Sequence, residues 1–305
     1  MSKFNKRVYG IVGIKSKMAN WNADFSGNPR TTSDGIIFGS DKAFKYPIKK
    51  MWEANNREVL YVKSYKNEKG EFKARSLPER YKQLFKKDVK EIKDKKEIIK
   101  DLFSIIDVLN FGITFAEANV SITGAVQIGQ GFNKYEDTSI EIMDILSPFT
   151  NSKKSTDKST SIGKKIVSNE AHYFYPFSVN PENYNIYTNE IDGLEGYTKE
   201  AYDAFKEGCL VAATAYNTNS KAGCENELAV FVECKESSKL YLANLDEYIN
   251  FKKGEEKDII DLSELMQILN KDEVKKEIEK VEIYYNPYTT KLEGDLAIAD
   301  VKDLF

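Results

Sequence analysis

Residues 111–167 read FGITFAEANVSITGAVQIGQGFNKYEDTSIEIMDILSPFTNSKKSTDKSTSIGKKIV, and this stretch decides the fold. Apolar residues alternate with polar ones along 111–115 and again along 140–145, which is typical of half-buried strands. Residues 147–163 are instead dominated by Lys, Ser and Thr, and residues 164–167 restore the strand pattern. The sequence therefore predicts a β-hairpin that leaves the body of the protein and ends in a polar, basic tip.

Charge is distributed unevenly along the chain. Residues 148–167 hold five lysines against one aspartate, so their balance is +4. The net charge of -3 hides a balance of +13 over residues 1–100, -6 over 101–147 and -14 over 168–305. The basic projection is either a surface loop without a further role or an element that binds a polyanion. The asymmetry favours a polyanionic partner, and it would also let one copy attract the opposite end of another, head to tail.

Composition excludes several classes of protein. The 305 residues suit one large domain or two, and no stretch approaches the roughly 20 apolar residues of a membrane helix. The N-terminus lacks the pattern of a signal peptide. Three cysteines without CxxC spacing predict a reduced, cytoplasmic chain and argue against zinc. His172 is the only histidine, so we expect no catalytic triad, no multi-histidine metal site and no cofactor.

The order of expected elements indicates an α+β fold. A strand at 7–15 and a turn-rich loop at 20–30 precede a helix capped by Ser40, although Pro47 predicts that this helix effectively starts there. Further segments follow in order: a hairpin at 59–75, helices at 78–107, an aromatic run at 172–177, a helix at 198–216, a strand at 228–234, helices at 261–280 and a strand at 281–285. This order is compatible with a ferredoxin-like split βαβ core, as in RNA-recognition modules, with large insertions.

Five short motifs occur in a fixed order, and their combination is specific. They are Ala19-Asn20-Trp21-Asn22-Ala23-Asp24 with Arg30, Ser40-Asp41 with Lys45 and Lys49, Asp107-Val108 with Phe111-Gly112, Thr123-Gly124-Ala125-Val126-Gln127, and Ser161-Ile162-Gly163-Lys164-Lys165-Ile166-Val167. Together they resemble the backbone subunit of type I CRISPR-associated Cascade effector complexes, of subtype I-B kind, in the RAMP superfamily. The resemblance spans about residues 7–232 and is weaker beyond. Four residues depart from the family pattern: Trp21 and Ala125 replace prolines, Ala23 a glycine and Tyr46 an arginine.

The resemblance implies a modified RNA-recognition fold with the shape of a hand. Residues 1–305 would form a single RRM-like domain, in which 59–107 supply the fingers, 148–167 the thumb hairpin and 243–305 a C-terminal helical and strand extension. The expected RNA-binding residues are Asn20, Asn22, Arg30, Ser40, Lys42, Lys45, Lys49, Gln127, Lys153, Lys154, Lys164 and Lys165. Because Tyr46 replaces an arginine, Lys42 or Lys50 would supply that phosphate contact.

The resemblance also implies partners. Copies of this chain would stack head-to-tail along one CRISPR RNA, beside other Cascade subunits, and support pairing of the guide with a target DNA strand. Such a subunit is not an enzyme. One alternative is a metal-dependent endoribonuclease of type III kind that uses Asp24, with Asp34 nearby, although a loop aspartate is more often a turn residue. Another alternative is a self-assembling protein that binds no nucleic acid.

Overall fold

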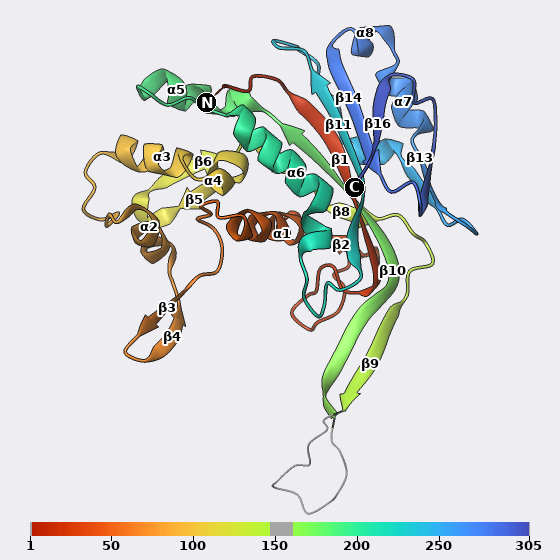
Figure 1. The fold of residues 1–305 in the computed structure, drawn as a ribbon, viewed down its shortest axis with the longest axis horizontal. Helices are drawn as coiled ribbons and strands as arrows, with labels where there is room; N and C mark the ends of the chain where they lie inside the picture. The colour runs from red at the N-terminus through yellow and green to blue at the C-terminus, as the bar shows by residue number, and fades with distance from the viewer. Residues whose placement is uncertain (1, 147–160, 305) are drawn as a thin grey trace, which may run out of the picture.

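A computed structural model describes residues 2–146 and 161–304 (Figure 1). Its centre is an antiparallel sheet in which β1 pairs with β10 on one side and β11 on the other, while β7 and β8 pair with the far edge of β10. These strands are β1 (Val8–Ala19), β7 (Val126–Ile128), β8 (Gly131–Asn133), β10 (Ser161–Val179) and β11 (Cys224–Cys234). With α1 (Asp41–Ala54) after β1 and α6 (Lys199–Ala215) between β10 and β11, this is the ferredoxin-like connectivity. The α+β prediction is confirmed.

Side chains of the central strands alternate between two cores, one on each face of the sheet. On β1, Val8, Val12 and Ile14 face the core beneath α1 and α6, whereas Tyr9 and Ile11 face the other core. The alternation follows from strand geometry, in which successive side chains point to opposite faces of the sheet. Because a core lies on each face, these strands are apolar on both faces. Helices α1 and α6 pack against each other, and α6 packs on β11 (Figure 1).

Helix α1 begins earlier than its proline predicted. Ser40 is the N-cap, its hydroxyl accepts from the backbone N–H of Ala43 at 3.3 Å, and the helix continues through Pro47. The expected start at Pro47 is therefore wrong. A proline inside a helix costs about 3 kcal/mol, but Phe44 and Trp52 are fully buried on the inner face of α1, and this burial stabilises the helix.

The segment between α1 and β7 lies to one side of the sheet (Figure 1). It contains β3 (Tyr65–Glu68), β4 (Glu71–Ala74), α2 (Leu77–Phe85), α3 (Lys95–Phe103), α4 (Ile106–Phe111), β5 (Gly112–Phe115), the 3-10 turn η1 (Ala116–Ala118) and β6 (Val120–Thr123). The predicted hairpin is confirmed as β3–β4, and it turns at Lys69-Gly70, where both residues have positive φ. The helical stretch predicted at 78–107 consists of three short helices.

A second hairpin projects from the end of the sheet that points downward in Figure 1. Strand β9 (Ile140–Leu146) pairs with the first third of β10, with Ile142 opposite Ile166. All seven residues of β9 are exposed, so among the described residues nothing covers this strand. The predicted excursion from the body is confirmed for the described part. Residues 147–160, which include Lys153 and Lys154, lie outside the described residues.

The C-terminal part covers the face of the sheet opposite α1 and α6. Strands β14 (Ile278–Tyr285) and β16 (Ala299–Asp303) extend the main sheet beyond β11, while a separate sheet orders β12 (Asn250–Lys252), β13 (Asp258–Asp261) and β15 (Thr290–Glu293). Leu265 and Leu269 of α7 (Ser263–Leu269) are buried in the second core. The remaining elements are β2 (Phe38–Gly39), which pairs with β8, and η2 (Pro181–Tyr184), α5 (Asn185–Glu190), η3 (Leu245–Tyr248) and α8 (Asp272–Lys275). Among the described residues, no helix is long and apolar enough to cross a membrane.

Candidate nucleic-acid interface

The turn-rich loop after β1, the start of α1 and the turn after α6 enclose a cleft of about 850 Å³. We call it the palm cleft. Four of the residues expected to bind RNA line it, which are Asn22, Arg30, Ser40 and Lys42. The sequence places these residues on two separate segments, and the fold brings them together.

The loop is held against α1 by specific hydrogen bonds. The Asn22 side-chain oxygen accepts the backbone N–H of Ser40 at 2.8 Å, and the Arg30 N–H donates to the Asn22 carbonyl at 2.8 Å. Below them, the buried Trp21 indole donates to the Tyr175 hydroxyl at 2.6 Å. The loop is therefore a fixed scaffold, which lowers the entropy lost when a ligand binds.

Cations dominate the palm cleft. Its charged lining, within the described residues, is Arg30, Lys42, Lys221 and the single acid Asp41. The Lys42 side chain is 87% exposed, and Lys42 and Lys45 both pair with Asp41, at 3.3 Å and 3.1 Å. The Nε of Arg30 is buried and, in the part of the chain that is described, makes no hydrogen bond. The residue as a whole is half-buried and lines the palm cleft, so the accessible part of its guanidinium can contact an anionic ligand.

Lys221 is a cleft residue that sequence reasoning missed. Its ammonium donates to the carbonyl of Asn20 at 2.7 Å and to that of Trp21, and it lies 5.6 Å from the centre of the Trp21 ring. Burial lowers the pKa of this lysine. Lys221 therefore holds the loop in place through two backbone carbonyls. No sequence signal pointed to this lysine, because it follows helix α6 in a stretch without a motif.

The five sequence motifs contact one another in the fold. Asn20 of the first donates to the carbonyl of Ile166 of the fifth at 3.1 Å. Lys49 of the second pairs with Asp107 of the third at 3.4 Å. A Cβ on Gly112 would lie 2.4 Å from the N of Gly124, so the third and fourth motifs need glycine where β5 approaches β6. The motifs, spread over about 150 residues, therefore build one continuous region.

Comparison with known proteins agrees with this arrangement. The family model described as "CRISPR-associated protein Cas7" matches residues 6–284. The chain belongs to this family. A search of the curated proteins finds no match. The resemblance indicated by the five motifs is thus confirmed at the level of the family.

One solved structure shares the fold of this Cas7-family chain, and a second is less similar. A chain of a structure named "CRISPR RNA-guided surveillance complex, pre-nicking" is similar with a TM-score of 0.59 at 15% identity, covering 97% of this chain and 96% of that chain. A chain of a "CRISPR RNA-guided surveillance complex" has a TM-score of 0.48 at 14% identity, covering 96% and 94%. At this identity, the first likeness shows the shared fold.

Two expected RNA-binding lysines of this Cas7-family chain lie further along α1. Lys45 pairs with Asp41, and Lys49 is almost fully buried, with its ammonium beside the carboxylate of Asp107 and 4.9 Å from the ring of Tyr61. Burial lowers the pKa of Lys49, and Asp107 opposes this effect only in part. Neither lysine lines the palm cleft. Lys49 instead holds the segment between α1 and β7 against α1 through the Tyr61 carbonyl and Asp107. Its RNA contact stays a prediction.

The remaining expected residues lie outside the palm cleft. Asn20 is buried and ties the loop to β10, while its side-chain oxygen has no partner among the described residues. Gln127 is exposed on β7 and donates to the carbonyl of Gly124. Lys164 is exposed and Lys165 half-buried on β10, in the hairpin that β10 forms with β9. Their contacts with RNA also stay predictions.

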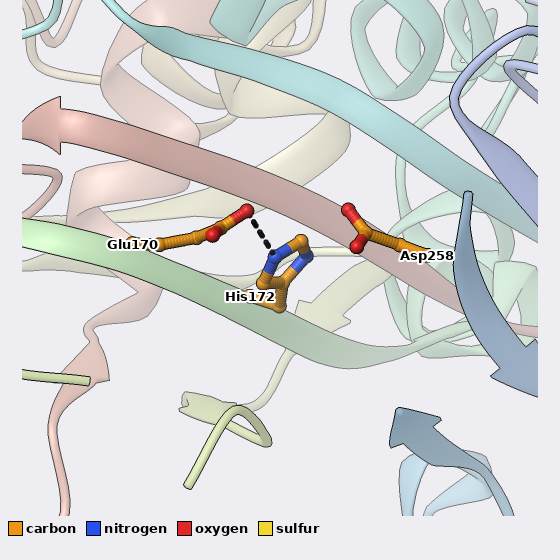
Figure 2. A group of neighbouring side chains, drawn as sticks. All are labelled: Glu170, His172 and Asp258. Atoms are coloured by element: carbon orange, nitrogen blue, oxygen red, sulfur yellow. Dashed lines mark hydrogen bonds and ion pairs between the residues drawn. The ribbon is translucent and has the colours of Figure 1, made fainter. Parts of the chain in front are cut away.

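Glu170, His172 and Asp258 lie close together, and their nearest ligand atoms are within 4.8 Å of one another (Figure 2). Two ammonium groups already neutralise this cluster. Lys253 lies 2.7 Å from Glu170 and 2.9 Å from Asp258, and Lys15 lies 3.0 Å from Asp258. Burial would raise the pKa of both carboxyl groups. Lys253 and His172 outweigh this effect at Glu170, and Lys253 and Lys15 outweigh it at Asp258, so both pKa values are lowered. The cluster therefore has the character of an ion-pair network that fastens β13 to β10, and we assign no metal to it.

Proposed function

We propose that this Cas7-family chain is a CRISPR RNA-binding backbone subunit of a type I Cascade effector complex. The observation that carries the proposal is the palm cleft, which collects Asn22, Arg30, Ser40 and Lys42 beside the N-terminus of α1. Cations and an N-terminal helix end are groups that bind phosphate without reading bases. A guide must be held whatever its sequence, so this chemistry suits the task.

We further propose that the chain acts as one RRM-like domain with fingers at 59–107, a thumb at 148–167 and an extension at 243–305. Copies would stack head-to-tail along the RNA, with other Cascade subunits and the target DNA strand as further partners. The projecting β9–β10 hairpin supports this, because an uncovered hairpin with exposed Ile142 and Leu146 is suited to contact with another molecule. The cytoplasm stays the expected location, and the three cysteines are free and buried.

Neutralising exposed and half-buried cations of the interface weakens RNA binding and reduces its dependence on salt. For the triple variant Lys42→Gln, Lys164→Gln, Lys165→Gln we expect the slope of log affinity against log salt to fall by about 1 for each phosphate that the variant no longer neutralises. Fluorescence anisotropy with a labelled guide RNA, from 50 to about 300 mM salt, measures the slope. The matched control is Lys291→Gln on β15, an exposed lysine far along the chain. An unchanged slope in the triple variant would contradict the proposal.

We also propose that the chain binds RNA without cutting it. The Asp24 carboxylate accepts the backbone N–H groups of Ser26 at 2.8 Å and Asn28 at 2.9 Å, so it closes the loop as a turn residue. Its role in the structure is thus accounted for without a reaction.

Asp24→Asn keeps one oxygen for these two N–H groups, so we expect normal assembly on RNA. Complementary RNA with magnesium should stay intact with both the parent and the variant, as judged on a sequencing gel. Regularly spaced cuts by the parent that disappear in Asp24→Asn would replace this proposal with the ribonuclease alternative.

A further inference from the structure

A second cleft lies next to the palm cleft, at the root of the β3–β4 hairpin. It has a volume of about 350 Å³, and we call it the finger cleft. Its lining includes the aromatic residues Tyr46 and Tyr61 and the cationic residues Lys63, Arg75 and Arg80. Tyr46 lines both clefts, so this side chain of α1 forms the ridge between them.

The two clefts have the same sign of charge. The charged residues described in the finger cleft are Lys63, Arg75 and Arg80, and none is acidic. Arg75 donates to the carbonyl of Tyr65, and Arg80 donates to that of Val59 at 2.6 Å, so both are held in place by backbone. Lys63 is exposed, 5.2 Å from the ring of Tyr65. A polyanion leaving the palm cleft therefore meets fixed cations on the far side of Tyr46.

The ridge itself is aromatic and accessible. The Tyr46 side chain is 37% exposed and contacts Tyr216 edge to face, with ring centres 5.7 Å apart. Tyr61, on the finger side, is 60% exposed. Partly exposed rings between cationic clefts are the groups on which the bases of a single strand stack, irrespective of their sequence.

We infer that single-stranded RNA passes from the palm cleft into the finger cleft across Tyr46, and that Tyr46 stacks on one of its bases. Arg30 and Lys42 hold phosphates before the ridge, and Lys63 holds one after it. The inference rests on the proposed function, because it extends the same RNA path. It assigns Tyr46 to base contact and the finger cleft to phosphate contact.

The test compares a single-stranded RNA oligonucleotide with an abasic ribose-phosphate oligomer of the same length. For Tyr46→Ala we expect affinity for RNA to fall about 5- to 150-fold, the range for loss of one stacked base. Affinity for the abasic oligomer should stay unchanged. Tyr46→Phe keeps the ring and should bind both ligands like the parent. Lys63→Gln should weaken both ligands equally, since phosphate contacts do not depend on bases.

Each contrary outcome has a distinct meaning. If Tyr46→Ala binds RNA like the parent, or if it loses equal affinity for both ligands, base stacking on Tyr46 is wrong while RNA binding by the palm cleft stands. If the parent protein binds neither ligand, the proposed function is wrong. If Tyr46→Ala instead changes the oligomeric state without RNA, as measured by sedimentation, the ridge is a contact between copies and the inference is overturned. Circular dichroism of each variant shows that it is folded.

Discussion

Asp107→Ala lowers the free energy of unfolding by about 3–5 kcal/mol, the usual effect of removing one partner of a buried ion pair. Asp107 is 1% exposed, and its two oxygens accept the backbone N–H groups of Leu60 at 2.8 Å and Tyr61 at 2.9 Å. Lys49 supplies the opposite charge at 3.4 Å. Without the carboxylate, the nearly buried ammonium of Lys49 loses its opposite charge. The backbone N–H of Leu60, which is buried, and that of Tyr61, which is partly buried, lose their acceptor.

Urea unfolding followed by circular dichroism measures this change. The matched control is Asp203→Ala, because Asp203 forms an ion pair with Lys199 on the exposed face of α6, and such pairs contribute about 0–1 kcal/mol. A loss below about 1 kcal/mol in Asp107→Ala would show that the pair does not anchor the segment between α1 and β7 to α1.

Glu282→Gln removes the centre of a second ion-pair network and changes how stability depends on pH. The side chain of Glu282 is 2% exposed on β14 and contacts the ammonium groups of Lys206, Lys280 at 2.7 Å and Lys302 at 2.9 Å. Burial would raise the pKa of Glu282, but the three lysines outweigh it and lower the pKa from 4.5 to about 2. This difference corresponds to about 3 kcal/mol of stability.

The sign of the pH effect follows from the lowered pKa. The stabilisation is complete above about pH 5, where the unfolded chain is also ionised, and it is lost as the pH falls towards 2. We therefore expect Glu282→Gln to be less stable than the parent at pH 7 and to approach it near pH 3. Denaturant titrations at pH 7, 5 and 3 measure the difference, and Glu293→Gln, in an exposed pair with Lys291, is the control. A difference that stays constant with pH would exclude Glu282 as the titrating group.

Local sequence patterns determined most of the secondary structure. A short β-branched run in 7–15 and a compact apolar run in 228–234 predicted β1 and β11, and the helix expected at 198–216 is α6, with Thr198 as its N-cap. These signals are local, because strand and helix periods and caps involve residues only a few positions apart. The expected start of α1 at Pro47 was wrong because this helix depends on a tertiary effect. The burial of Phe44 and Trp52, which stabilises α1, is not visible in the local sequence.

The candidate site depended on contacts between distant residues more than the secondary structure did. The motifs identified the family and named Arg30, Ser40 and Lys42, which the fold brings to one cleft. They did not reveal that Lys49 is turned towards Asp107, nor that Lys221 supports the loop from the turn after α6. A lysine in a sequence has the same appearance whether it is solvated, ion-paired or buried, and its surroundings alone distinguish these cases.

By itself, the sequence determined the α+β class, the family, the projecting hairpin and the basic first third of the chain. Only the tertiary structure decided which cations face a ligand, that Tyr46 separates two clefts, and that Glu170, His172 and Asp258 form part of an ion-pair network (Figure 2). The physical reason is distance along the chain. Periodicity and capping act between near neighbours, whereas a cleft or a buried ion pair joins residues more than 50 positions apart, such as Lys49 and Asp107.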